Sequence, residues 1–207
     1  MKERELRSLW DGRRPAMQDA RFQSAVLCPF FQRPAGLELL FEVRSAALRR
    51  QPGEVCFPGG RMEPGETAAQ CALRETKEEL GIPPTEVEVL GLADFICHPT
   101  GYFLQPVPAL VTAAGMAALR PAPAEVAEIF SVPVDFFLDM PPAVYHYTME
   151  PAVPKDFPYD AVGVPPSYSW GRLEVEVPVW RWEGRAIWGA TARIVRRLAQ
   201  VLREGNR

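Results

Sequence analysis

The chain is poor in the residues on which disulfide-linked, zinc-binding and thiol-dependent proteins rely. Its 207 residues include only two histidines, His98 and His146. They also include four cysteines that form no C-x-x-C pair, namely Cys28, Cys56, Cys71 and Cys97. We interpret the cysteines as reduced thiols of a cytoplasmic protein, and we expect neither a zinc site nor a cysteine nucleophile.

Charge of one sign and long apolar runs are scarce as well. The net charge of −3 gives no basis for binding nucleic acid or membranes by bulk attraction. No apolar segment approaches the length of a membrane span, and residues 1–5 lack the apolar run of a signal peptide. The composition, 47% apolar and 24% charged, is typical of a globular protein. We therefore expect one domain over residues 1–207, in which local positive charge or a metal must meet any anionic substrate.

One region is densely charged: residues 60–82 read GRMEPGETAAQCALRETKEELGI. Thr67 followed three residues later by Gln70 is a capping box, and Gly81 followed by Pro83 is a typical helix end. These signals predict a helix of about fourteen residues between them.

Two neighbouring stripes run along this predicted helix, and we expect only the first to be buried. The first stripe is Ala69, Ala72, Leu73, Thr76 and Leu80. The second stripe is Cys71, Arg74, Glu75, Glu78 and Glu79. For Cys71, burial as a small apolar group competes with a place in the site, and we favour burial.

The helix should gather three carboxylates. Glu75, Glu78 and Glu79 stand at i, i+3 and i+4, so their side chains should converge and repel one another. Mg²⁺ or Mn²⁺, which prefers hard oxygen ligands, would relieve this repulsion. A solvated helix face is the alternative, but the turn at residues 57–60 lets backbone approach a ligand closely.

Two residues are predicted to support the carboxylates. Arg74 can pair with Glu78 at i+4 and so orient a ligand carboxylate. Glu66 can hold the loop or a water on the metal, or it can simply favour the positive end of the helix dipole.

The pattern G-x5-E-x7-R-E-U-x-E-E-x-G-U, where U is bulky and apolar, fits residues 60–82 at every defined position except Thr76. In this the stretch resembles the box of the Nudix hydrolases, which cleave a nucleoside diphosphate linked to another moiety. The resemblance implies an α/β fold, an α/β/α sandwich around a mixed β-sheet with a loop–helix–loop motif. It also implies Mg²⁺- or Mn²⁺-dependent attack of water on phosphorus, with Glu75 and Glu79 as direct metal ligands and Glu78 as a third. Thr76 should alter packing more than chemistry.

Residues 40–60 resemble the signature L-L-T-x-R-S-x3-R-x3-G-x3-F-P-G-G of the coenzyme A diphosphatase branch, from which Phe41 and Glu42 depart. Arginine presents a bidentate fork to phosphate oxygens, although loop arginines are often only solvated. The predicted substrate-binding residues are Arg44, Ser45, Arg49, Arg50, Phe57, Gly59 and Gly60.

Further along the chain, residues 125–134 are similar to a segment that follows the central sheet in these enzymes. Glu125 is therefore a candidate metal ligand or general base, with a plain surface charge as the alternative. The predicted catalytic residues are Glu79, Glu78, Arg74, Glu66 and Glu125.

The other helices and strands are predicted from hydrophobic periodicity and from the glycines and prolines that interrupt it. We predict helices over residues 2–10 and around 136–138, and a final helix with a stripe of Ile194, Leu198, Val201 and Leu202 that ends at Gly205. The predicted strands are 24–31, 37–43, 87–97, 103–111 and 173–182, the last forming a hairpin with 186–188. Residues 139–168, rich in proline and tyrosine, are predicted to form an irregular excursion that serves as a pantetheine pocket, a dimer contact or a plain loop.

The resulting hypothesis is a metal-dependent hydrolase that converts coenzyme A or acyl-CoA to 3′,5′-ADP and (acyl-)4′-phosphopantetheine. One alternative is another nucleoside diphosphate derivative such as ADP-ribose, for which Pro99 stands at a suggestive spacing. Another is a non-catalytic binding protein, against which the intact carboxylates argue. Monomer and homodimer remain open, as do Mg²⁺ and Mn²⁺.

Overall fold

The computed structural model describes residues 3–13, 22–98 and 100–205. The strands are β1 (Phe22–Arg33), β2 (Gly36–Arg44), β3 (Val55–Cys56), β4 (Gly59–Arg61), β5 (Val87–Val89), β6 (Ile96–His98), β7 (Tyr102–Val111), β8 (Val126–Pro133), β9 (Ala143–Met149), β10 (Leu173–Trp182) and β11 (Arg185–Trp188). The helices are α1 (Glu3–Trp10), α2 (Ala68–Leu80), the 3-10 turn η1 (Pro84–Glu86), α3 (Ala113–Ala117), α4 (Val134–Asp139), α5 (Tyr159–Val162) and α6 (Gly189–Gly205). Pro99, on which one alternative substrate relied, lies outside the described residues.

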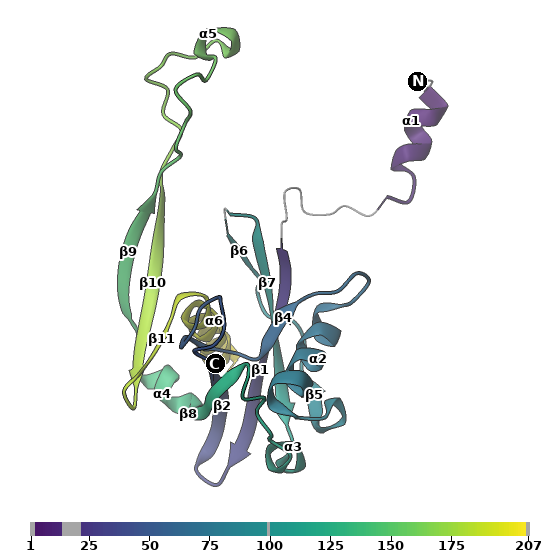
Figure 1. Ribbon diagram of the computed structural model, residues 1–207, viewed down its shortest axis with the longest axis vertical. Helices are drawn as coiled ribbons and strands as arrows, with labels where there is room; N and C mark the ends of the chain where they lie inside the picture. The colour runs from purple at the N-terminus through teal and green to yellow at the C-terminus, as the bar shows by residue number, and fades with distance from the viewer. Residues whose placement is uncertain (1–2, 14–21, 99, 206–207) are drawn as a thin grey trace.

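The main sheet is mixed, as predicted. Its central order is β3-β2-β1-β7-β5, with β4, β6 and β8 paired to β1, β7 and β2. The β1–β7 pair is parallel, whereas β2 is antiparallel to β1, β3 and β8. Strand β4 pairs with β1, and both lie beside α2 (Figure 1).

Helices cover both faces of this sheet. Leu27 of β1 packs in a buried cluster with Ala72 of α2, whereas Phe30 packs in a second cluster with Ile194 of α6. Strand side chains alternate between faces, so one strand serves both helix layers. The predicted α/β/α sandwich is thereby confirmed.

Two strand predictions need correction. The predicted strand over residues 87–97 is divided into β5 and β6, because Gly91 has a φ of +151° and the chain between the strands is largely exposed. Residues 126–133, predicted to follow the sheet, form β8 within it and pair with β2.

The irregular excursion predicted at 139–168 is also wrong in part. It contains β9, which pairs antiparallel with β10 and forms an arm that projects from the body, with α5 near its tip (Figure 1). The prolines flank β9 and none stands inside it, so its β-branched and aromatic residues are free to form a strand.

The final helix largely matches its prediction. Ile194 and Leu198 are buried, but Val201 is 47% exposed, while Val195 and Ala199 are buried instead. The buried arc is centred between positions 195 and 198, which leaves Val201 at its margin. None of the helices within the described residues has the length and apolarity to cross a membrane.

Candidate active site

Helix α2 begins and ends where the sequence predicts. The Thr67 hydroxyl accepts a hydrogen bond from the Gln70 backbone N–H (3.3 Å), and the Gln70 side chain accepts one from the Thr67 N–H (2.9 Å). At the other end Gly81 adopts φ +75° and donates its N–H to the Lys77 carbonyl. These contacts lie within the box itself, so both ends of the helix are fixed by residues at most four apart in the chain.

The division of α2 into a buried and an exposed stripe is only partly correct. Its buried residues are Cys71, Ala72, Thr76, Glu79 and Leu80. Glu79 is 3% exposed and therefore shares the buried face from which we had excluded it. Cys71 is buried, as favoured, and Thr76 donates its hydroxyl to the Ala72 carbonyl (2.6 Å), so its polarity is satisfied within the helix.

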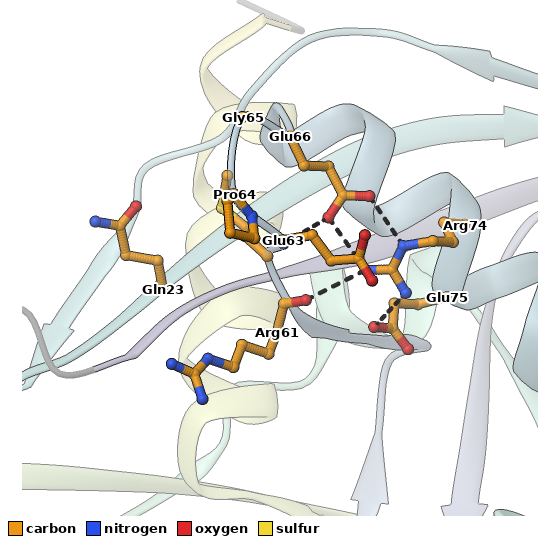
Figure 2. Close-up of a pocket in the computed structure, with 9 residues that line it drawn as sticks. Gln23, Arg61, Glu63, Pro64, Gly65, Glu66, Arg74 and Glu75 are labelled. Carbon is orange, nitrogen blue, oxygen red and sulfur yellow. Dashed lines mark hydrogen bonds and ion pairs between the residues drawn. The ribbon is translucent and has the colours of Figure 1, made fainter.

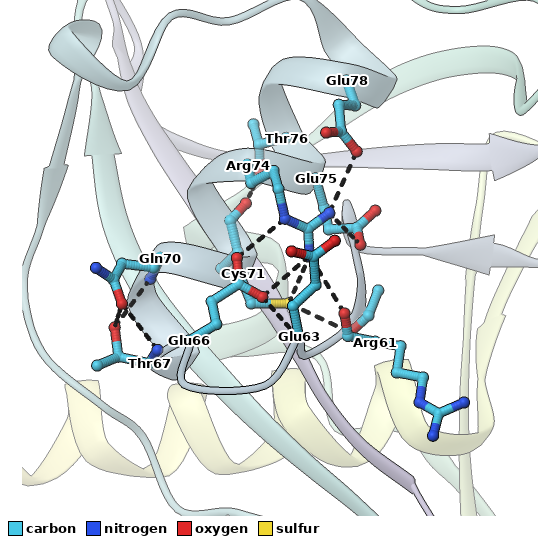
Figure 3. A network of polar contacts seen from close by, with 12 residues as sticks. Arg61, Glu63, Glu66, Thr67, Gln70, Cys71, Arg74, Glu75, Thr76 and Glu78 are labelled. Atoms are coloured by element: carbon cyan, nitrogen blue, oxygen red, sulfur yellow. Dashed lines mark hydrogen bonds and ion pairs between the residues drawn. The ribbon is translucent and has the colours of Figure 1, made fainter.

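Arg74 organises the carboxylates around it (Figure 3). Its guanidinium binds both oxygens of Glu66, at 2.9 Å from Nε and 3.1 Å from Nη2. It also donates to Glu75 (2.8 Å), to Glu78 (3.3 Å) and to the Arg61 carbonyl (3.2 Å). Hydrogen bonding to Arg74 lowers the pKa of Glu66. A fifth partner is the Cys71 sulfur, 3.7 Å from Nη2. The predicted pairing with Glu78 is thus with one of five partners, and the bidentate bond to Glu66 joins the loop to the helix.

The glycine turn before the helix lies directly against two carboxylates. The Gly59 N–H donates to Glu79 Oε2 at 2.8 Å. A Cβ on Gly60 would stand 2.3 Å from Glu75 Oε1, and a Cβ on Gly59, at φ +154°, would stand 2.3 Å from the Ala25 carbonyl oxygen. Gly59 is therefore required by the backbone opposite it, whereas Gly60 leaves room for the Glu75 carboxylate, and the predicted approach of this backbone to a ligand stays a prediction.

Glu42 belongs to the same site, although the sequence analysis did not assign it a role. It is 1% exposed in β2, and its Oε1 accepts a hydrogen bond from the Cys56 thiol (3.2 Å). Its Oε2 has no hydrogen-bond partner among the described residues. Burial raises the pKa of Glu79 to about 9, and the charge of Glu42 is the second cause. Burial is also the largest cause of the raised pKa of Glu42, which is about 7. The available signal was a carboxylate in an apolar strand, at a position where the signature has threonine.

Glu125 is brought to these carboxylates by a backbone contact. The Ser45 N–H donates to the Glu125 carbonyl at 2.7 Å, which joins the loop after β2 to the loop before β8. Although Glu125 is exposed, its charge contributes to the raised pKa of Glu75. Burial is the main cause there, and Arg74 opposes it. The charge of Glu125 therefore acts on the cluster, while its role as a metal ligand or general base stays a prediction.

The acidic residues fit a divalent cation by their chemistry but do not converge as the sequence predicts. Within residues 3–13, 22–98 and 100–205, no three His, Cys, Asp or Glu side chains form a metal-binding group as they stand. Glu78 is 56% exposed and turned to Arg74, whereas Glu79 is turned to the Gly59 N–H. Mutual repulsion of buried carboxylates and the unpartnered oxygen of Glu42 nevertheless call for positive charge.

A cleft of about 670 Å³ opens beside Arg74 and Glu75 (Figure 2). Its lining residues are Gln23, Arg61, Met62, Glu63, Pro64, Gly65, Glu66, Arg74 and Glu75. Gln23 was missed because only the β1–β4 pairing brings residue 23 to the box, whereas Arg61 stands inside the box at a position that its pattern leaves undefined.

The predicted phosphate-binding arginines lie on the same side of the molecule as this cleft. Arg44 ends β2, and its Nε donates to the Arg50 carbonyl at 3.4 Å, which closes the loop between them. Arg50 and Arg61 both lie over the Phe22 ring, at 5.8 and 5.2 Å from its centre. Arg49 is exposed in the same loop.

One predicted substrate contact is corrected. Phe57 is 2% exposed and stacks on Phe41 with ring centres 4.8 Å apart. Its side chain is part of the core and holds the turn in place, so it does not face a ligand.

Comparison with known proteins agrees with this arrangement. The family model of the NUDIX domain matches residues 21–148. The chain is 34% identical over 185 residues to the uncharacterized Nudix hydrolase NudL of Photorhabdus laumondii, a match that covers 89% of this chain and 87% of that protein. It is 39% identical over 134 residues to the peroxisomal coenzyme A diphosphatase NUDT7 of Mus musculus, covering 64% of this chain but only 55% of that protein.

Among solved structures, a Caenorhabditis elegans Ap4A hydrolase binary complex matches with a TM-score of 0.47 and 19% identity, over 54% of this chain and 80% of that one. The family model covers more than half of the chain, and the NudL match spans most of both proteins. The chain therefore belongs to the Nudix family of hydrolases, which act on diphosphate bonds.

Proposed function

We propose that this protein is a metal-dependent diphosphatase of coenzyme A or its acyl thioesters, which releases 3′,5′-ADP and (acyl-)4′-phosphopantetheine. The observation that carries the proposal is the 2.7 Å hydrogen bond from Ser45 to the Glu125 carbonyl. It ties the loop that resembles the coenzyme A signature to the acidic cluster. The similarity to the mouse coenzyme A diphosphatase supports the same substrate class.

Coenzyme A demands positive charge at two places, because it carries a diphosphate and a separate 3′-phosphate. Arg44, Arg49 and Arg50 supply that charge in one short loop. Guanidinium groups bind phosphate oxygens bidentately, and Arg44 is already fixed by its bond to the Arg50 carbonyl. We assign these arginines to the phosphates of the substrate.

Glu75 and Glu79 would hold Mg²⁺ or Mn²⁺, with Glu78 as a third carboxylate. A bound divalent cation neutralises phosphate charge and lowers the pKa of water. Arg74 keeps Glu75 oriented, and the Gly59 N–H does the same for Glu79. Gly60 leaves room for the Glu75 carboxylate against the backbone.

In the reaction a water oxygen attacks one phosphorus of the diphosphate, and the phosphoric anhydride P–O bond breaks. The proton of the water passes to a glutamate, for which Glu79 and Glu125 are the two candidates. Glu79 is buried and hydrogen-bonded, whereas Glu125 is exposed on a loop. Because Glu79 would also hold the cation, Glu125→Gln is the variant that tests the choice: full turnover in it would exclude Glu125 as the base.

The experiment that tests the substrate is a panel of coenzyme A, acetyl-CoA, ADP-ribose and NADH, incubated with Mg²⁺ or Mn²⁺ and resolved by product chromatography. We expect 3′,5′-ADP from coenzyme A and acetyl-CoA, with a higher kcat/KM than for ADP-ribose or NADH. Preferential cleavage of ADP-ribose would show that the protein acts on another nucleoside diphosphate derivative and would contradict the proposal. Metal-dependent binding of coenzyme A with no product would leave it a binding protein.

A further inference from the structure

The β9–β10 arm projects from the body of the protein, and most of β9 is exposed to solvent. Within the described part of the chain β9 pairs with β10 alone, and its outer edge faces away from the body (Figure 1). All of its residues except Met149 are classed as exposed. A two-stranded ribbon is marginally stable unless one face is covered.

The two faces of the arm differ sharply in polarity. The antiparallel register sets apolar residues opposite one another on one face, in the pairs Tyr145–Val177 and Tyr147–Val175. The apolar row consists of Ala143, Tyr145, Tyr147, Met149, Leu173, Val175, Val177 and Val179. The other face carries the pairs His146–Glu176 and Thr148–Glu174 along its outer part, and the apolar pair Val144–Pro178 at its base, where Pro178 is buried. Such alternation is typical of a ribbon whose apolar face is covered.

Much of that row is exposed, although Met149, Val175, Val177 and Val179 are half-buried. Glu176, on the polar face, binds Arg196 of α6 at 2.7 Å, so the polar face is the one that meets the helix. On the apolar face Tyr145 is 61% exposed, Tyr147 44% and Leu173 45%.

The apolar area that the arm exposes would form more than half of one partner's share of a dimer interface. With about 200 Å² for each tyrosine side chain, the row and the tip residues Tyr168 and Trp170 expose roughly 500 Å² of apolar surface. The largest apolar patch on a monomer is about 300–600 Å² and often has a function, and a stable interface buries about 800 Å² on each partner. The arm therefore lies toward the upper end of that range and would supply roughly three fifths of one partner's share.

Charge and shape favour an identical partner. Residues 143–149 contain no Lys, Arg, Asp or Glu, so two copies of the row can approach without like-charge repulsion. A shallow cleft of about 390 Å³, lined in part by Met149, Trp170 and Leu173, lies at the tip end of the row. When two rows pack antiparallel, Tyr145 at the base of one arm comes to the cleft at the tip of the other.

We propose that the apolar faces of two β9–β10 arms pack against each other, so that the protein is a homodimer with a two-fold axis between the arms. The contact is isologous, with Tyr145 and Tyr147 of each copy as its buried anchors. The interface lies outside the diphosphatase site and does not depend on which substrate that site takes.

Analytical ultracentrifugation of the full chain over a wide range of concentrations tests the proposal. We expect a dimer for the unaltered protein, and at least a 100-fold higher dissociation constant for the double variant Tyr145→Lys, Tyr147→Lys, because it removes two anchors. The matched control is His146→Lys, Thr148→Lys, which adds the same two lysines to the polar face of the same strand and should remain dimeric. Circular dichroism and hydrolytic activity show that each variant is folded.

A crosslinking experiment keeps the test independent of the tyrosine variants. In a Cys97→Ala background, Val177→Cys places a thiol in the apolar row and Glu174→Cys places one on the opposite face. We expect a short bismaleimide to give a covalent dimer with the first variant and not with the second. A protein that is monomeric at every concentration, a double tyrosine variant that still dimerises, or crosslinking through Glu174→Cys would each overturn the proposal.

Discussion

Helix α2 and the β9–β10 arm break the ordinary rule of burial in opposite directions. At α2, Glu79 and its neighbour Glu42 in β2 are ionisable groups held away from solvent, at 3% and 1% exposure. On the arm, Tyr145 and Tyr147 are large apolar side chains that solvent reaches. Both arrangements cost stability, so each points to something absent from an isolated chain: a cation at the first, another protein surface at the second.

The largest expected effect tests the buried carboxylates directly. Glu79→Gln should lower kcat for coenzyme A by about 10²–10⁴-fold at saturating Mg²⁺, because charge is lost at the cation site and a candidate base is removed. The amide oxygen can still accept the Gly59 hydrogen bond, so the circular dichroism spectrum should not change. Glu88→Gln, an exposed carboxylate on β5, is the control and should stay within twofold. Unchanged turnover in Glu79→Gln would remove this residue from the mechanism.

Substitutions of the adjacent residues Gly59 and Gly60 should have different effects, the first on stability and the second on activity. Gly59→Ala should lower the free energy of unfolding by about 3 kcal/mol or more, because its Cβ meets the Ala25 backbone and its φ is +154°. Gly60→Ala meets only the end of the Glu75 side chain, so it should unfold near the normal denaturant concentration yet hydrolyse coenzyme A at least tenfold more slowly. Urea titration and steady-state kinetics on both variants provide the comparison; equal losses of stability would contradict it.

Glu42 makes the stability of the metal-free protein depend on pH. Burial raises its folded-state pKa from 4.5 to about 7, so the folded state keeps a proton that the unfolded state releases. Stability should therefore fall as pH rises through this window, by at most about 3 kcal/mol for a shift of this size.

Glu42→Gln should remove that part of the fall. Urea unfolding in EDTA at pH 5 and pH 8 measures it for both proteins. A variant that loses as much stability as the parent between these pH values would show that Glu42 does not titrate in this range.

The smallest effect is expected at the polar face of the arm. Glu176→Gln should change the melting temperature by less than about 1 °C, because exposed ion pairs such as that with Arg196 contribute little. A drop of several degrees would mean that this ion pair holds the arm in place, and the arm would then not need its apolar face covered to be stable.

Prediction from sequence succeeded where the decisive contacts are short in range. The Thr67–Gln70 capping box, the stop at Gly81 and the pairing of Arg74 with Glu78 all join residues at most four apart. The order of residues alone brings such groups together once a helix forms. The convergence of Glu75, Glu78 and Glu79 failed because it ignored what each side chain could bind elsewhere.

Prediction failed where a residue's neighbours are distant in the chain. Glu42 joins the site through Cys56, fourteen residues away. The bond from Ser45 to Glu125 spans a far longer stretch. Residues 173–182 were predicted as a strand, but β9 was missed because Tyr145 and Tyr147 lie between prolines, and only pairing with β10 shows that they form a strand.

The sequence by itself determined the family, the bounds of helix α2 and the chemistry of its side chains, since these depend on residue types at fixed spacing. Only the tertiary structure decided that Glu79 is buried, that Glu42 lies beside it and that an apolar row remains uncovered. Those outcomes follow from how strands β2, β3, β8, β9 and β10 pair, and strand pairing is a long-range choice that local propensities leave open.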